Sequence, residues 1–315
     1  MVVLVTGANG FVGSALCARL NRDEVSVRSA VRARNLLPFG TDAFQIGSLS
    51  ADTDWSDALS NVEQVVHLAA RVHIMKEIGL DPLAEFRLVN VKGTANLATQ
   101  AAAAGVKRFI FLSSIKVNGE FTEQGQPYSA DDVPAPADPY GVSKHEAEEL
   151  LKQIAFKTGM EVVIIRPPLV YGPGVKANFE SMMRWLARGV PLPLAAVTHN
   201  RRSLVALDNL VDLIVTCLNH PAAASQTFLV GDGEDLSTSQ LILRMGAELG
   251  NPANLFYLPP PLLKLGATLL NKPDVYKRLC SSLQLDIAKT KQLLGWAPPI
   301  SVDEGLRRAA KGFRR

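Results

Sequence analysis

A glycine-rich segment near the start of the chain, TGANGFVG at Thr6–Gly13, restricts the possible folds more than any other feature. It follows the apolar run Val2–Val5 and leads into a helical pattern over Val12–Leu20. Glycines at a strand-to-helix turn allow a tight bend and a close approach of the backbone to a pyrophosphate, and the helix N-terminus supplies amide donors. The spacing is GxxGxxG rather than the common GxGxxG, but this context favours dinucleotide binding over a simple turn. The expected cofactor contacts are Gly7, Gly10, Phe11, Val12 and Gly13.

Short apolar runs alternate with longer helical patterns through the first half of the chain. The expected strands are Val2–Thr6, Val25–Val31, Gln64–Leu68, Arg108–Leu112 and Glu161–Arg166. The expected helices are Val12–Leu20, Asp81–Ala104 and Pro139–Thr158. Strands that alternate with helices predict a parallel, doubly wound sheet, and continuous apolar strands fit a sheet covered on both faces. The sequence therefore predicts an α/β fold.

The pattern changes after Arg166-Pro167-Pro168, where loops rich in proline and glycine begin. Beyond them we expect helices at Phe179–Ala187, Asp208–Asn219 and Val302–Lys311. A strand is expected at Leu204–Leu207, returning to the sheet, and another at Thr227–Val230. The residues Ser237–Gln240 predict a capping box at the start of a further helix. Residues 1–167, with about 203–228, are expected to form a Rossmann dinucleotide-binding domain. Residues 168–202 and 229–315 would form a smaller mixed C-terminal substrate domain.

Charge and cysteine content exclude several classes of protein. The 315 residues include 33 basic and 30 acidic side chains, with no long basic run, so we expect no nucleic-acid partner. Cys17, Cys217 and Cys280 lie far apart without a CxxC pattern, which indicates reduced thiols in the cytoplasm.

No apolar run reaches the roughly 18 residues that a membrane-spanning helix needs, so no span is expected. The run Leu258–Leu270 comes nearest, but three consecutive prolines and Lys264 interrupt it. We expect a partly buried loop and helix there, and contact with a membrane surface is the alternative.

The end of the second expected strand indicates which dinucleotide binds. An acidic residue there would bind the ribose 2′-hydroxyl of NAD, whereas arginine accommodates the 2′-phosphate of NADP. Val31 stands at that position, and Arg32 and Arg34 follow it. The sequence favours NADP(H), with NAD(H) as the alternative if both arginines are only solvated surface charges.

A candidate catalytic group lies at the start of the expected helix Pro139–Thr158. Tyr140 and Lys144 are four residues apart and share one helical face. Asp138 is a good N-cap and places Tyr140 in the first turn. Ser114 follows an apolar strand, at the carboxyl edge where open α/β sheets bind ligands.

These three side chains suit acid–base chemistry at a hydroxyl or ketone. A phenol with a pKa of about 10 is a poor catalyst at neutral pH, and a neighbouring ammonium and an oxidised nicotinamide ring would lower that pKa. Ser114 could hydrogen-bond the substrate oxygen. The alternative is a tyrosine with a solvated lysine one turn away. The five histidines show no metal-ligand spacing, so no metal site is expected, and His67 is interpreted as a core residue.

Together these motifs resemble the extended short-chain dehydrogenase/reductases, the family of nucleotide-sugar epimerases, dehydratases and 4-ketoreductases. The likeness runs nearly end to end and rests on the glycine loop, His67–Ala70, Asn90, Ser113-Ser114, Tyr140 with Lys144, Arg166-Pro167 and Leu294–Trp296. It implies further cofactor contacts from Leu49, Leu68, Ala69, Ala70, Tyr140, Lys144 and Pro167. It also implies substrate contacts from Ser114, Lys116, Asn178, Leu192 and Arg202, with Asn178 and Arg202 at a diphosphate and the Leu192 region at uracil.

Two departures from the family pattern narrow the expected activity. The 4,6-dehydratases carry an Asp-Glu pair after the serine or threonine of the triad, where this chain has Ile115-Lys116. The 4-epimerases usually bind NAD through an acidic residue at the end of the second strand, where this chain has Val31. Both departures favour reduction by NAD(P)H of the C4 ketone of a UDP-4-keto-6-deoxy-N-acetylhexosamine, a precursor of surface polysaccharide. The alternatives are a UDP-sugar 4-epimerase with bound NAD and a non-catalytic dinucleotide sensor. The likeness also implies a homodimer through Asp81–Ala104 and Pro139–Thr158.

Overall fold

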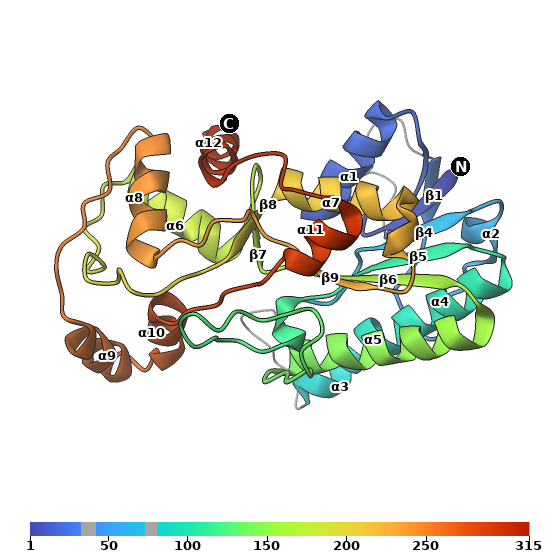
Figure 1. The fold of residues 1–315 in the computed structure, drawn as a ribbon, viewed down its shortest axis with the longest axis horizontal. Helices are drawn as coiled ribbons and strands as arrows, with labels where there is room; N and C mark the ends of the chain where they lie inside the picture. Colours follow the sequence, from blue (N-terminus) through green and yellow to red (C-terminus); the bar gives the residue numbers. More distant parts are fainter. Residues whose placement is uncertain (33–41, 73–80, 315) are drawn as a thin grey trace.

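The computed structural model describes residues 1–32, 42–72 and 81–314. Its centre is a parallel sheet of seven strands in the order β3-β2-β1-β4-β5-β6-β9 (Figure 1). The strands are β1 (Val2–Thr6), β2 (Ser26–Val31), β3 (Asp42–Gln45), β4 (Gln64–His67), β5 (Arg108–Leu112), β6 (Glu161–Arg166) and β9 (Thr227–Leu229). The strand order reverses between β1 and β4, and such a reversal opens a ligand crevice at the carboxyl ends of the strands. The predicted α/β doubly wound fold is confirmed.

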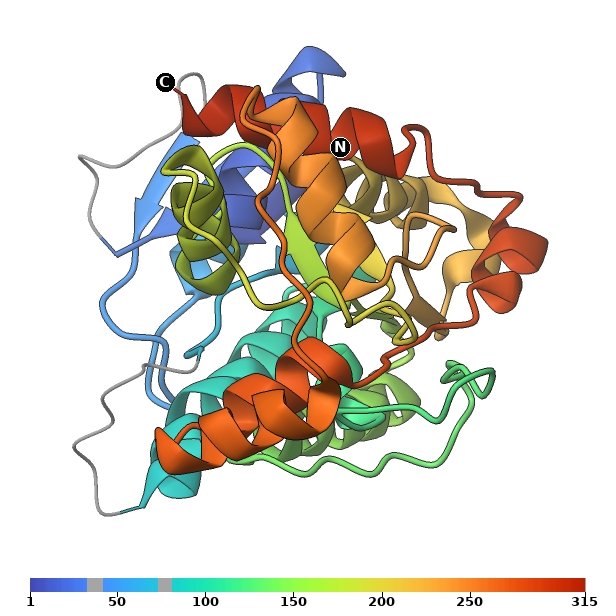
Figure 2. The ribbon, with the colours of Figure 1, turned by 90° about the vertical axis from the view of Figure 1, so that its left-hand side faces the viewer.

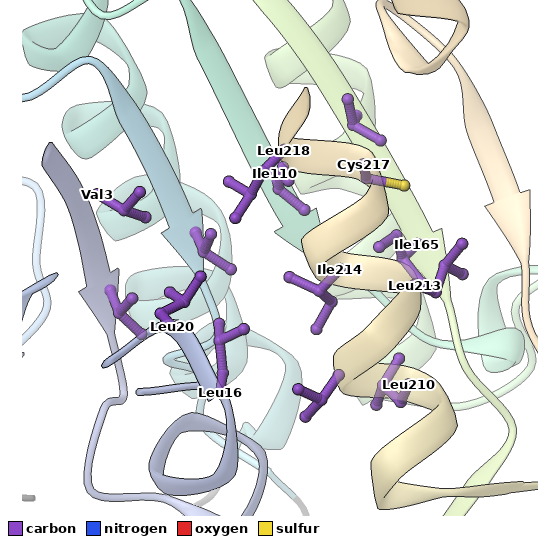
Figure 3. Close-up of a cluster of buried hydrophobic side chains, with 14 of the residues drawn as sticks. Val3, Leu16, Leu20, Ile110, Ile165, Leu210, Leu213, Ile214, Cys217 and Leu218 are labelled. Atoms are coloured by element: carbon purple, nitrogen blue, oxygen red, sulfur yellow. The ribbon is translucent and has the colours of Figure 1, made fainter. Parts of the chain in front are cut away.

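Two helices cover one face of the sheet, α1 (Phe11–Arg22) and α7 (Leu207–Asn219). Figure 3 shows how their apolar stripes meet the strands: Leu16 and Leu20 of α1 lie one turn apart beside Val3. The α7 stripe, which packs over Ile110 and Ile165, consists of Leu210, Leu213, Ile214, Cys217 and Leu218. This spacing places each stripe on a single helical face, as a helix packed on a sheet requires.

The opposite face is covered by α2 (Ser56–Leu59), α4 (Thr94–Ala103) and α5 (Pro139–Thr158). The helix expected over Asp81–Ala104 is present without a break, and it consists of α3 (Pro82–Phe86), a π-helical segment η2 (Arg87–Gly93) and α4. Within η2, Gly93 lies so close to Leu49 that a Cβ would be 2.8 Å from the leucine Cγ. The backbone therefore departs from α geometry where it packs tightly, which the local pattern did not reveal.

A second core lies beside the large sheet. It is built on a two-stranded parallel sheet of β7 (Leu169–Tyr171) and β8 (Leu204–Ala206), packed with α6 (Ala177–Ala187), α8 (Thr238–Glu248) and α12 (Val302–Phe313). The expectation that Leu204–Leu207 returns to the main sheet is wrong, because β9 already pairs with the edge of β6. The capping box predicted at the start of α8 is present, with Ser237 and Gln240 bonding reciprocally.

The C-terminal part crosses back onto the first core. Leu294 at the end of α11 (Ala288–Leu294) and Trp296 just after it pack into the cluster formed by α1 and α7. The indole Nε1 of Trp296 donates a hydrogen bond of 3.0 Å to Asp212 in α7. The shorter elements are the 3-10 turns η3 (Ile115–Val117) and η4 (Pro221–Ala223).

Two helices, α9 (Pro260–Leu269) and α10 (Pro273–Cys280), lie at one end of the long axis of the molecule (Figure 1). A helix was expected within Leu258–Leu270 and is found, but neither α9 nor α10 contains a fully buried residue. Across the described ranges, no helix has the length and apolar character that crossing a membrane requires.

Candidate active site

The glycine loop forms a backbone cradle that side chains would fill. Gly7 adopts a φ of 67°, and a Cβ there would lie 2.9 Å from the backbone nitrogen of Ala69. A Cβ on Gly13 would lie 2.1 Å from the Gly7 carbonyl oxygen, so this glycine lets α1 pack against the loop itself. Gly10 closes the turn by donating its N–H to the same carbonyl, at 2.9 Å. These tight contacts fit a loop whose backbone binds a pyrophosphate.

The N-terminus of α1 presents backbone amides next to this cradle. Its N-cap is Gly10, which has no side chain to bond the first amides, and no acidic residue lies in the first turn. Phe11 packs against both cores, whereas Val12 packs on the first. No side chain of the helix start neutralises the positive end of the helix dipole, so this end can bind an anion. The residues present therefore fit the pyrophosphate of a dinucleotide.

The end of β4 is fixed to the cradle through Thr6. The Thr6 hydroxyl accepts a hydrogen bond from Ala69 N at 3.2 Å and lies 2.7 Å from His67 Nδ1. His67 Nε2 lies 3.0 Å from the Thr94 hydroxyl. Burial, with a smaller contribution from Lys144, lowers the His67 pKa to about 3. His67 is thus a neutral core residue, as expected, and Leu68–Ala70 follow it beside the glycine loop.

The remaining cofactor candidates lie at different depths. Arg32 is exposed directly after β2, and its carbonyl accepts a hydrogen bond from Gln45 at 3.3 Å. Arg34 lies outside the described residues. Leu49 is buried against η2, and Pro167 is buried at the end of β6, where its carbonyl accepts the Ile115 N–H at 2.9 Å.

The local sequence fixes where helix α5, which carries Tyr140 and Lys144, begins. Asp138 is the N-cap, and its carboxylate accepts the Gly141 N–H at 2.7 Å, with Pro139 at the first helical position. Tyr140 therefore lies in the first turn and Lys144 one turn later on the same face. The ring of Tyr140 packs edge-on against Phe86 of α3, with the ring centroids 5.9 Å apart.

Three contacts bring the start of α5 to the end of β5. The Lys144 Nζ donates to the Leu112 carbonyl at 2.8 Å. A Cβ on Gly141 would lie 2.8 Å from the Lys116 carbonyl oxygen, so only glycine permits this approach. The ammonium of Lys116 forms an ion pair with Asp138. Ser114 caps the 3-10 turn Ile115–Val117 just after β5, so its hydroxyl lies at the same edge of the sheet as Tyr140 and Lys144.

Burial controls the charges at this edge. It lowers the Lys144 pKa to about 7, and the Nζ lies 4.3 Å from the centre of the Phe111 ring. Burial, and then the charge of Asp138, raises the Tyr140 pKa above its ordinary value. The sequence analysis expected Lys144 to lower this pKa. In the protein alone the loss of water around the phenol and the Asp138 carboxylate both favour the neutral phenol, and Lys144 does not offset them.

A buried charge cluster lies behind the site, and sequence reasoning missed it. The guanidinium of Arg166 bonds both carboxylate oxygens of Glu148, at 3.0 and 2.6 Å, and the Oδ1 of Asn118 at 2.9 Å. The Ser113 hydroxyl donates to Glu148 at 2.5 Å. Ser113 is thereby occupied in the core, which leaves the half-buried Ser114 as the hydroxyl at the edge. The available signal was Glu148 one turn beyond Lys144 on α5.

Asn90, which the sequence analysis named only as part of the family resemblance, also contributes to the site. It is buried within η2, where its amide accepts the Arg71 N–H at 2.8 Å and donates to the Arg71 carbonyl at 3.0 Å. It also donates to the Ser143 hydroxyl of α5 at 3.0 Å. Asn90 therefore ties the chain after β4 to the helix that carries Tyr140 and Lys144.

The expected substrate contacts are less closely grouped. Lys116 is held between Asp138 and Glu120, whereas Asn178 is exposed at the start of α6. Leu192 is buried in the second core, and its backbone pairs with the chain around Leu255.

Arg202 lies between the second core and α10. Its Nη1 donates to the backbone carbonyls of Arg278 and Ser281, at 3.1 and 3.2 Å. Burial and the nearby charge of Arg278 lower the Arg202 pKa. Within the described part of the chain, neither guanidinium has a carboxylate within ion-pair distance. Two adjacent unpaired cations suit a diphosphate.

The cradle and the catalytic edge define an enzyme that uses a nicotinamide dinucleotide. The model of the NAD dependent epimerase/dehydratase family matches residues 3–231, and the chain belongs to that family. It is 49% identical to a UDP-glucose 4-epimerase of Vibrio cholerae, over 99% of this chain and 95% of the relative. It is 28% identical to an N-acetyl-alpha-D-glucosaminyl-diphospho-ditrans,octacis-undecaprenol 4-epimerase of Escherichia coli O157:H7, over 97% and 93%. The structure of MoeE5 in complex with UDP-glucose and NAD superimposes with a TM-score of 0.79 at 27% identity, covering 100% and 99% of the two chains.

Proposed function

We propose that the protein is a UDP-sugar 4-epimerase that inverts the C4 carbon of a hexose with a retained dinucleotide. One observation carries this proposal: a chain 49% identical to a UDP-glucose 4-epimerase along almost its whole length holds a glycine cradle and the Ser114–Tyr140–Lys144 set at one sheet edge. Both curated relatives described above are named as 4-epimerases of sugars on a diphosphate. We assign UDP as the carrier because the more similar relative and MoeE5 are described with UDP-glucose.

Each catalytic side chain has a distinct task in this proposal. When bound, the dinucleotide supplies a hydride acceptor, a source of the returning hydride and a positive ring charge. Tyr140 takes the proton of the C4 hydroxyl as the ketone forms and returns it when the alcohol forms again. Ser114 hydrogen-bonds the same oxygen in both states. Lys144, held at the Leu112 carbonyl one turn beyond Tyr140, is the cation of this set that would hydrogen-bond the dinucleotide when it is bound.

The reductase hypothesis preferred in the sequence analysis is less well supported than its epimerase alternative. That preference relied on two departures from the family pattern, Ile115-Lys116 in place of the Asp-Glu pair of the dehydratases and Val31 in place of an acid at the end of β2. The residue at the end of β2 would contact the adenosine ribose of the dinucleotide, which is remote from the carbon that reacts. Its identity is therefore a poor guide to the reaction.

We propose NAD as the cofactor, because the family and the MoeE5 complex are both described with NAD. The NADP(H) preference inferred from the sequence rests, within the described residues, on Arg32. Replacing Arg32 with alanine tests it. Tighter binding of NAD than of NADP by the parent, with the change weakening both cofactors equally or neither, supports NAD, whereas a selective loss of NADP binding would restore the original inference.

The activity itself is tested with purified protein and no added cofactor. Acid denaturation should release NAD, and incubation with UDP-glucose or UDP-N-acetylglucosamine should give the C4-inverted sugar, resolved by anion-exchange chromatography. A protein that releases no dinucleotide and consumes NADPH only with a 4-keto sugar would be a reductase.

We further propose that the protein is cytoplasmic and forms a homodimer through the α3–α4 and α5 faces. We also propose two domains: residues 1–167 with about 203–228 bind the dinucleotide, and residues 168–202 with 229–315 bind the substrate. Arg87 of η2 and Glu146 of α5 bridge these two helices at their surface, and all three cysteines are free thiols. Light scattering on the purified protein measures the assembly. A monomer at micromolar concentration would overturn the dimer.

A further inference from the structure

The helical hairpin formed by residues 258–280, which contains α9 and α10, exposes a continuous apolar stripe. Leu262, Leu265 and Leu269 follow one another at helical spacing on a single face of α9. Their exposed fractions are 51%, 55% and 78%, and the adjacent Leu270 is 73% exposed. Single exposed leucines are ordinary, but a stripe of this kind marks an interaction surface.

The stripe faces outward because the other side of the hairpin is already packed. Leu263 of α9 and Leu279 and Cys280 of α10 contact the second core. The hairpin lies at one end of the molecule in Figure 1, and in Figure 2, which is seen from that end, it faces the viewer. The exposed leucines are therefore a separate surface on an anchored element.

Exposed aromatic side chains lead into this surface. Phe256 and Tyr257 precede α9, and Tyr257 is 71% exposed. A tyrosine ring has one polar end, so Tyr257 favours the boundary between lipid headgroups and acyl chains.

The hairpin carries a net positive charge, which is complementary to an anionic partner. Residues 258–280 contain four basic residues, Lys264, Lys272, Lys277 and Arg278, and one acid, Asp274. This net charge of +3 equals that of the whole chain, so the remaining residues are balanced in charge. All the excess positive charge of the protein is thus next to its exposed leucine stripe. Apolar side chains bordered by lysines are typical of helices that lie in the surface of an anionic bilayer.

We propose that the α9–α10 hairpin docks the protein on the surface of an anionic lipid bilayer. The leucine stripe and the ring of Tyr257 enter the headgroup region, and Lys264, Lys272 and Lys277 contact lipid phosphates. Because α10 bonds Arg202 through its last carbonyls, docking places the expected diphosphate site beside the membrane. This proposal concerns lipid binding, so it stands or fails independently of the proposed activity.

Co-sedimentation with vesicles tests the docking with the full-length protein. Binding is compared on phosphatidylcholine vesicles and on vesicles that also contain phosphatidylglycerol. We expect binding at least about tenfold stronger to the anionic vesicles, and a loss of this preference in high salt. No binding, or equal binding to both vesicle types, would overturn the proposal.

Matched variants locate the docking surface. The double variant Leu265→Glu, Leu269→Glu should lose vesicle binding, and the triple variant Lys264→Gln, Lys272→Gln, Lys277→Gln should lose the preference for anionic lipid. The control is Leu243→Glu with Leu293→Glu, which alters exposed leucines of α8 and α11 that are 49% and 41% exposed. Solution activity and thermal unfolding of all three variants should match the parent.

Two results would contradict this assignment. If the stripe variants bind vesicles like the parent, the hairpin is not the lipid-binding surface. If they instead change the assembly size in light scattering without changing vesicle binding, the stripe contacts a second copy of the chain.

Discussion

The catalytic edge, formed by the turns Thr6–Gly13, Leu68–Ala70 and Ser113–Lys116, differs sharply from the region around Arg202 and α10. At the catalytic edge, backbones meet so closely that Gly7, Gly13 and Gly141 have no room for a Cβ. Around Arg202, the guanidinium bonds only backbone carbonyls among the described residues, and the adjoining helices are exposed. Hydride chemistry needs fixed distances, whereas a diphosphate can be held by charge alone. If the proposed function holds, the difference separates a preformed reaction site from an adaptable substrate site.

The largest expected effect comes from removing the phenol at the catalytic edge. Tyr140→Phe should lower kcat by at least about 10²–10⁴-fold, because the C4 oxygen loses its proton acceptor. The retained dinucleotide should stay bound, since the glycine cradle is untouched. Steady-state kinetics and acid release of the cofactor measure both effects, with the exposed Tyr257→Phe as control. Turnover like that of the parent would remove Tyr140 from the mechanism.

The buried polar network of the catalytic edge should make the cofactor-free protein sensitive to acid. His67 has a pKa of about 3 when folded and an ordinary pKa when unfolded, so below about pH 6.5 the unfolded state binds the extra proton. The free energy of unfolding should therefore fall as pH drops from about 6.5 to 3, by at most about 1.4 kcal/mol per pH unit. Urea unfolding across this range should show a weaker pH dependence for His67→Gln. Identical slopes in the two proteins would contradict the assignment.

A single methyl group tests how rigid the cradle is. Gly13→Ala places a Cβ against the Gly7 carbonyl and should destabilise the protein by about 1–3 kcal/mol, with loss of retained cofactor. Gly47→Ala is the matched control, because no atom lies within 4 Å of a Cβ at that glycine. Thermal unfolding and cofactor content report the two effects. A Gly13→Ala protein that keeps its cofactor would show that the loop is not the cradle.

The smallest expected effect lies in the substrate region. Arg202→Gln should raise the KM for the nucleotide sugar about tenfold with little change in kcat, because it removes charge that binds substrate and transition state alike. The neighbouring Arg201→Gln is the control, since its guanidinium bonds the carbonyls of Thr198 and Asn200 instead. An unchanged KM, or a loss in kcat alone, would break the distinction between the two regions.

The sequence predicted the catalytic half better than the substrate half for a physical reason. The strands β1, β5 and β6 and the helix α5 have the bounds expected, because continuous apolar runs and an Asp138-Pro139 start are local signals. The partner of β8 is not local, since it depends on β9 occupying the edge of β6. The π-helical turn around Asn90 likewise depends on contacts with distant residues.

The distinction between local signals and contacts with distant residues applies to the site as well. The sequence indicated that Ser114, Tyr140 and Lys144 belong together, since strand ends and helical spacing are readable from a single chain. It did not indicate the burial that raises the Tyr140 pKa and lowers that of Lys144. Nor did it indicate that Glu148 and Arg166 pair in the core, because charged residues on a helix and at a strand end resemble surface residues.

The proposed activity is tested most directly by following the hydrogen at C4. UDP-glucose labelled with deuterium at C4 is mixed with the purified protein, without added cofactor, and the product is examined by NMR. We predict a C4-inverted sugar that keeps the deuterium at C4, since the hydride leaves and returns within one site. An inverted product that has exchanged its deuterium with solvent, or no inversion unless NADPH is added, would contradict it.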